Sequence, residues 1–215
     1  CLINAYKINN FADQNNIYNE RIKVIDFFNN DNAFSLYGHN WSRFPKPLNC
    51  YKGTIEDKIL TYKSYDFGFI FENSNNELGG ISEKLWDSMA AGCIPIYYGA
   101  PNIGEYIPRD CYIDYRKFNN LSDLKNYMIK MSLKEKIARR DQIKKFMSSE
   151  TYDQFTSKGF TKNILFHVNE IKNLKANKKN IINLKIKLIK KLFKHRIPLK
   201  THKRFYFNLV FSKYI

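Results

Sequence analysis

Cysteine and histidine are scarce in this chain, and neither is spaced for a metal site. The 215 residues include only four of each, at Cys1, Cys50, Cys93 and Cys111 and at His39, His167, His195 and His202. None of the cysteines forms a CxxC pair, so neither a zinc site nor a disulfide framework is supported. We therefore predict buried or free thiols in a protein of a reducing compartment.

Long apolar runs are missing as well. No segment approaches the roughly eighteen consecutive apolar residues that a membrane-spanning helix needs. The first five residues lack the basic start and apolar stretch of a signal peptide, and the chain has no initiating Met. We expect it to be part of a longer protein.

Acidic residues are absent from the C-terminal end, so most of the net charge of +16 lies there. Residues 172–215 contain fourteen Lys or Arg and no Asp or Glu, which leaves a charge of only +2 on residues 1–171. Because the body is nearly neutral, we expect no nucleic-acid-binding fold. The basic object is the tail.

The tail also has an amphipathic pattern. On a helical wheel, residues 181–193 place their apolar side chains on one side and their lysines on the other, with Lys185 as the exception. Pro198 ends this helix, and residues 205–211 are aromatic and apolar. The pattern predicts peripheral membrane contact through 178–215, worth about 1 kcal/mol per basic residue near anionic lipid. Packing on other parts of the protein, or RNA contact, are the alternatives.

Apolar runs of strand length alternate with helical periods before the tail. Strands are expected at 1–7, 34–38, 67–71, 94–98 and 111–114, and helices at 18–28, 55–60, 83–90, from Asn120 or Ser122 onward, at 133–147 and at 152–171. This alternation predicts an open α/β fold with a Rossmann-like parallel sheet over 1–171, followed by a basic amphipathic tail over 172–215.

Residues 65–101 form the most informative unit. An apolar strand at 67–71 leads through a loop with Gly79 and Gly80 to Ser82, which can cap a helix that stops at Gly92, and a second strand follows at 94–98. Such a βαβ unit places ligands at the carboxyl ends of its strands.

The polar residues at that edge suggest a diphosphate site. The helix after Ser82 presents unpaired N–H groups to an anion, and Lys84 adds a positive charge. Glu72 and Glu83 can accept hydrogen bonds from ribose or sugar hydroxyl groups. Neither a Walker loop nor a GxGxxG pattern is present, so a hydride-transfer cofactor is not expected. The alternative is that Glu83 and Lys84 are ordinary surface residues of a first helical turn.

Three motifs stand out in the sequence: FENS at 71–74, SEKLWDSMAAGCIPIYYGAPN at 82–102 and YNERI at 18–22. They resemble glycosyltransferase family 10, the α-1,3-fucosyltransferases, and the similarity covers about residues 2–130. The resemblance implies the C-terminal half of a GT-B enzyme that binds GDP-fucose and transfers L-fucose with inversion to a glycan acceptor. The product would be a glycoprotein glycan or a lipopolysaccharide.

The family's site residues carry over to five positions. The resemblance implies that Arg21 and Lys84 contact the diphosphate, that Glu83 holds sugar or ribose hydroxyls, and that Glu72 and Asn73 line the nucleotide side. It implies no required metal or other cofactor, with a divalent ion at most stimulatory. For Arg21 the alternative is an exposed helix arginine, with Arg43 as the substitute.

Two departures limit what the resemblance carries over. Gly80 stands where several members have a Tyr, so no contact from that ring is expected here. The family's general base belongs to an N-terminal acceptor domain that is outside this sequence, so the catalytic base is unknown and turnover by this part alone is not expected. The resemblance and the tail together suggest a peripheral membrane location, on the cytoplasmic face in a bacterium or at the Golgi in a eukaryote. Transfer of another GDP-sugar, or a non-catalytic membrane- or nucleic-acid-binding module, are the alternative functions.

Overall fold

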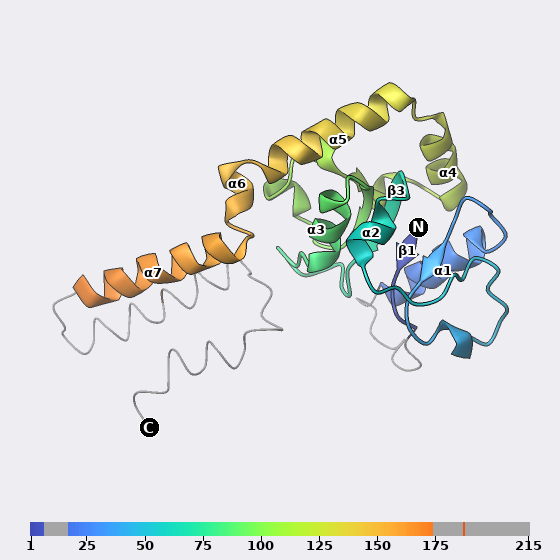
Figure 1. Ribbon diagram of the computed structural model, residues 1–215, viewed down its shortest axis with the longest axis horizontal. Coiled ribbons are helices and arrows are strands. Elements are labelled where there is room, and N and C mark those ends of the chain that lie inside the picture. The colour runs from blue at the N-terminus through green and yellow to red at the C-terminus, as the bar shows by residue number, and fades with distance from the viewer. Residues whose placement is uncertain (7–16, 174–186, 188–215) are drawn as a thin grey trace. The chain divides into compact units, whose positions relative to one another are not determined.

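The computed structural model describes residues 1–6, 17–173 and Lys187 (Figure 1). It divides into two compact units, Cys1–Met147 and Ser148–Ile215, and the first carries the sheet. The tail helix predicted at 181–193, apart from Lys187, and the aromatic end at 205–211 lie outside the described residues. The predicted domain boundary after residue 171 stays a prediction. No helix among the described residues is long and apolar enough to cross a membrane.

Five parallel strands form one open sheet in the order β2-β1-β3-β4-β5. The strands are β1 (Leu2–Ile3), β2 (Leu36–Tyr37), β3 (Phe67–Phe71), β4 (Ile94–Tyr98) and β5 (Ile113–Asp114). This confirms the predicted Rossmann-like parallel sheet. The strands at 1–7, 34–38 and 111–114 were predicted too long. β2 and β5 lie at the edges, and each pairs with only one named strand. β1 lies between β2 and β3, but it ends at Ile3 and only Leu2 is in register with β3.

The two central strands are the longest and the most deeply buried. All five residues of β3 pair with all five of β4, from Phe67 opposite Ile94 to Phe71 opposite Tyr98. Ile70, Ile94 and Ile96 are completely excluded from solvent. A parallel sheet covered on both faces explains why these strands are continuous apolar runs. All four cysteines are buried with free thiols, as predicted.

Seven α-helices connect or follow the strands in the described residues. They are α1 (Tyr18–Phe28), α2 (Lys58–Tyr62), α3 (Glu83–Ala90), α4 (Leu121–Lys130), α5 (Leu133–Met147), α6 (Glu150–Asp153) and α7 (Ser157–Asn173). Short 3₁₀ helices occur at Trp41–Arg43, Ile103–Glu105, Arg109–Cys111 and Tyr115–Lys117.

The helix boundaries follow from side chains that cap them. Asn120, and not Ser122, caps α4, because its Oδ1 accepts the N–H of Asp123 at 2.8 Å. The helix predicted at 55–60 begins only at Lys58, since Asp57 caps it through the N–H of Leu60. The single helix predicted at 152–171 is wrong: α6 ends at Asp153 and Thr156 starts α7 by accepting the N–H of Gly159.

Ion pairs and a hydrogen bond connect helix α5 to the amino edge of the sheet. Asp66, directly before β3, accepts from Lys136 at 2.7 Å and from Arg140 at 2.5 Å. Arg140 also donates to the main-chain oxygen of Gly92. A cavity of about 920 Å³ opens at this same edge, lined by Phe28, Phe34 and these ion pairs. Three of its basic side chains, Lys125, Lys136 and Arg140, are paired with carboxylates. The residues that the sequence analysis singled out lie at the opposite edge.

Candidate functional site

The carboxyl edge between β1 and β3 is the point where the chain changes direction across the sheet. β2 lies on one side of β1 and β3 on the other. Open α/β sheets bind ligands in the crevice at such a switch point. Asn4 follows β1 here, and Glu72 and Asn73 follow β3. The fold therefore brings together polar residues almost seventy positions apart in the sequence.

Arg21 on the first turn of α1 joins the ends of these two strands. One guanidinium nitrogen donates to the main-chain oxygens of Phe71 and Glu72 at 2.8 and 2.5 Å, and to Asn73 Oδ1 at 3.2 Å. The other donates to Asn4 Oδ1 at 3.3 Å. Arg21 is only 2% exposed, so the alternative of an exposed helix arginine is wrong. Arg43, its substitute, is exposed on a 3₁₀ helix.

The Arg21 side chain keeps its charge in this buried position. Burial lowers the pKa of Arg21, and the nearby Glu72 carboxylate opposes that change. Since an arginine titrates far above neutral pH, the guanidinium remains a cation. It therefore contributes positive charge to the edge while it satisfies main-chain oxygens at the end of β3.

Asn4 is a site residue that the sequence analysis missed. Its Oδ1 accepts from Arg21, and its Nδ2 is buried with no acceptor among the described residues. A buried amide that donates to nothing is uncommon in folded proteins. The only signal in the sequence was a polar residue directly after an apolar run, which is the position that Glu72 and Asn73 also occupy.

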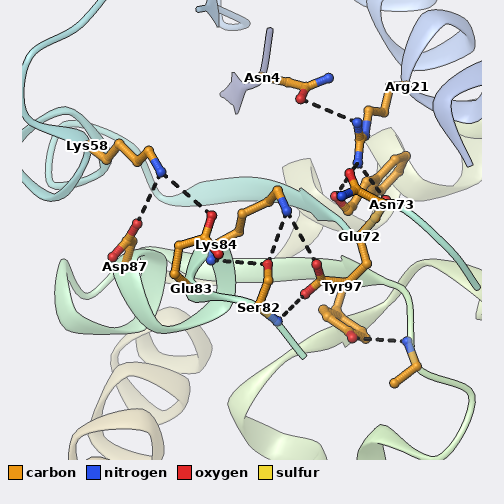
Figure 2. A network of polar contacts seen from close by, with 12 residues as sticks. Asn4, Arg21, Lys58, Glu72, Asn73, Ser82, Glu83, Lys84, Asp87 and Tyr97 are labelled. Carbon is orange, nitrogen blue, oxygen red and sulfur yellow. Dashed lines mark hydrogen bonds and ion pairs between the residues drawn. The ribbon is translucent and has the colours of Figure 1, made fainter. Parts of the chain in front are cut away.

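Glu72, Ser82 and Lys84 form a cluster where α3 begins (Figure 2). Glu72 Oε1 accepts the main-chain N–H of Ser82 at 2.9 Å, and Oε2 lies 3.4 Å from Lys84 Nζ. Lys84 Nζ also donates to Ser82 Oγ at 3.1 Å, and the same oxygen caps the helix through the N–H of Lys84. The predicted cap at Ser82 is confirmed. Lys84 is not an ordinary surface lysine, since its side chain is 19% exposed.

Glu83 lies apart from this cluster. Its side chain is 64% exposed, and its Oε1 lies 3.9 Å from Nζ of Lys58 on α2 (Figure 2). Lys58 also pairs with Asp87 at 3.6 Å, where burial raises the pKa of the carboxyl group. The structure therefore places Glu83 beside Lys58, a residue that the sequence analysis did not single out, and leaves its carboxylate open to solvent.

The loop between β3 and α3 is held by specific contacts. The N–H of Gly79 donates to Asn102 Oδ1 at 2.8 Å, and Asn75 Nδ2 donates to the hydroxyl of Tyr98 at 2.8 Å. Gly79 has a φ of +66°, which favours glycine. A side chain at Gly80 would bring its Cβ within 2.9 Å of Glu77 Cβ. In this loop conformation a larger residue at position 80 would require Glu77 to move.

These contacts suit the edge to an anion rather than a metal ion. Two partly or fully buried cations, Arg21 and Lys84, face the edge together with the N-terminus of α3. Within the described ranges no group of three or more His, Cys, Asp or Glu side chains could hold a metal ion. The general base remains unassigned.

Comparison with known proteins identifies a family model and several relatives. The protein-family model "Glycosyltransferase family 10 (fucosyltransferase) C-term" matches residues 5–181. The GDP-fucose protein O-fucosyltransferase 3 of Xenopus laevis is 37% identical over 68 residues, which is 31% of this chain and 14% of that protein. The 4-galactosyl-N-acetylglucosaminide 3-alpha-L-fucosyltransferase 9 of Mus musculus is 29% identical over 122 residues, 56% of this chain and 30% of that protein.

Solved structures are similar at a lower level. A crystal structure of an alpha1,3-fucosyltransferase with GDP-fucose has 17% identity and a TM-score of 0.43, covering 70% of this chain and 38% of that one. The chain spans less than a third of the length of the two curated relatives described above.

Proposed function

Because this chain belongs to glycosyltransferase family 10 (fucosyltransferase), whose C-terminal model matches residues 5–181, we propose that it forms the donor-binding part of an inverting fucosyltransferase. The donor is GDP-fucose and the acceptor a glycan, with α-1,3 linkage. The parallel sheet is then the C-terminal half of a GT-B enzyme, and the acceptor domain with the general base belongs to the rest of the protein.

The observation that carries the proposal is the position of Lys84 at the N-terminus of α3. Its ammonium lies between Glu72 and Ser82 at the carboxyl edge, where a diphosphate would also meet the helix dipole. Departure of GDP develops negative charge on that diphosphate, and a cation held in place stabilises it. Arg21 adds positive charge from the switch point, with Asn73 beside it on the nucleotide side.

Glu83 supports the sugar end of this proposal. Its carboxylate is exposed at the first turn of α3, so it can accept hydrogen bonds from hydroxyl groups of the ribose or the fucose. The nearby Lys58 ammonium lies 3.9 Å away and leaves the Glu83 side chain 64% exposed. No metal or other cofactor has a part in this proposal.

The acceptor has two candidate classes. The mouse relative is named for a glycan acceptor, a 4-galactosyl-N-acetylglucosaminide, and the frog relative for a protein. We place the glycan first because the aligned segment is longer for the mouse protein, 122 residues against 68. Fucose transfer to each acceptor class by the full-length enzyme separates the two.

Calorimetry with GDP, UDP and ADP tests the donor assignment. We expect GDP to bind most tightly, with unchanged affinity in the presence of EDTA. No binding of GDP would reject the proposal in favour of a non-catalytic module. Turnover of GDP-fucose against GDP-mannose by the full-length enzyme then identifies the sugar, with a preference for GDP-mannose contradicting fucose transfer.

A further inference from the structure

One buried carboxylate connects the end of β3 to the start of α3. Glu72 is 4% exposed, and its two oxygens lie against Ser82 N–H at 2.9 Å and Lys84 Nζ at 3.4 Å (Figure 2). Its own N–H donates to the main-chain oxygen of Tyr98 at 2.8 Å, so its backbone continues the pairing of β3 with β4. Both carboxylate oxygens therefore face α3.

Lys84 needs a counter-ion where it lies. It is the second residue of α3, where the positive end of the helix dipole disfavours an ammonium group. The side chain is mostly buried, so water screens this repulsion only weakly. Glu72 supplies the opposing charge. An ammonium group has three N–H bonds, and with Glu72 and Ser82 as acceptors one is left for an incoming anion.

The end of β4 leaves room for the Glu72 side chain. A Cβ on Gly99 would lie 2.8 Å from Glu72 Cβ and 2.6 Å from the hydroxyl oxygen of Tyr97, and closer still to Glu72 Cγ. The backbone of Gly99 is outside the left-handed region, so the need is for space and not for an unusual φ. Tyr97 is fully buried, and its hydroxyl accepts the N–H of Ala100, which fixes this segment beneath Glu72.

We infer that Glu72 is a positioning residue, which holds the Lys84 ammonium at the start of α3 before the donor binds, and that Gly99 provides the space this requires. The inference rests on the proposed function, because it takes the incoming anion to be the diphosphate of a GDP-sugar. It replaces direct nucleotide contact by Glu72, because this residue is only 4% exposed and both its oxygens lie against α3.

A double-mutant cycle on GDP affinity tests the inference in the full chain. Glu72→Gln keeps an oxygen for the Ser82 N–H but removes the charge that holds Lys84. We expect GDP affinity to fall about tenfold when Lys84 is present. In the Lys84→Met background the same substitution leaves the affinity unchanged or raises it, because only repulsion between Glu72 and the diphosphate remains to be lost.

The other outcomes decide between roles. An equal loss in both backgrounds indicates direct contact or a general structural effect, and it overturns the inference, as does no loss when Lys84 is present. If the wild type binds GDP and the cycle is additive, the donor assignment stands and only the positioning role fails. If the wild type binds no GDP, both fail.

Two further variants keep the test interpretable. Glu56→Gln removes an exposed carboxylate, so it matches the charge change, and GDP affinity should stay within about twofold. Gly99→Ala displaces the Glu72 carboxylate without changing any charge, so it should also lower the affinity for GDP when Lys84 is present. In the Lys84→Met background this loss of affinity should disappear. Thermal unfolding of each variant checks that it is folded.

Discussion

The guanidinium of Arg21 donates to the main-chain oxygen of Phe71 at 2.8 Å and so ties the first turn of α1 to the last residue of β3. The same nitrogen also donates to the main-chain oxygen of Glu72. Oxygens at the end of a buried strand need such donors, since leaving them without a partner costs free energy. Arg21 thus builds the edge on which the candidate site lies.

Replacing Arg21 should therefore destabilise the fold. Arg21→Met removes the donor to two main-chain oxygens and leaves them buried, so we expect the free energy of unfolding to fall by about 3 kcal/mol. Urea denaturation measures the change. The matched control is Arg43→Met at an exposed position, where the change should stay within about 0.5 kcal/mol. Equal stabilities of the two variants would contradict the structural role.

The sequence predicted the central unit well because each part of it has local causes. The apolar run at 67–71, the cap at Ser82 and the stop at Gly92 determine β3 and α3 without long-range help. The lengths of β1, β2 and β5 and the break after Asp153 were less predictable. The length of such a strand depends on pairing with strands that are distant in the sequence. The break depends on Thr156, which caps α7 at a point where the apolar pattern predicts a continuous helix.

The candidate site was predicted in composition but not in geometry. Arg21 lies on the same helical face as Tyr18 and Ile25, so its phase in α1 could have indicated burial. The pairing of Glu72 with Lys84 crosses from a strand end to a helix start, and no spacing rule fixes such a contact. Asn4 joins the site only through the sheet order.

Gly99→Ala should lower stability through overlap. The added methyl group would meet Tyr97 and Glu72 inside normal contact distance, which we expect to cost about 1–3 kcal/mol. Thermal unfolding measures it. The control is Gly104→Ala, whose Cβ would meet nothing closer than 3.6 Å, and its melting temperature should hardly change. A Gly99→Ala variant as stable as this control would show that the space beside Glu72 is not needed.

The contribution of Asp66 should depend on pH. Hydrogen bonds from Lys136 and then Arg140 hold the pKa of Asp66 below its usual value of 3.8, although burial opposes them. A depressed carboxyl pKa contributes stability above the unfolded value, and this is lost as pH falls through the folded one. Asp66→Asn should therefore destabilise the protein at pH 7 and progressively less below about pH 3.8. Unfolding of both proteins across this range measures it, and a constant difference would contradict the assignment.

The basic tail predicts binding to anionic lipid. Deletion of residues 172–215 removes fourteen Lys or Arg residues. Binding to anionic vesicles should therefore fall by about tenfold or more. The affinity for GDP should be unchanged, because the site residues all precede residue 172. Vesicle sedimentation with anionic and neutral lipid measures the first, and calorimetry the second. Equal sedimentation of the two proteins would reject membrane contact through 172–215.

A structure of the protein bound to GDP tests the central claim most directly. The account predicts that the diphosphate lies at the N-terminus of α3, within hydrogen-bonding distance of Lys84 Nζ, with Glu72 still against the N–H of Ser82. A nucleotide bound at another edge of the sheet, or a Lys84 side chain turned away from the diphosphate, would contradict it.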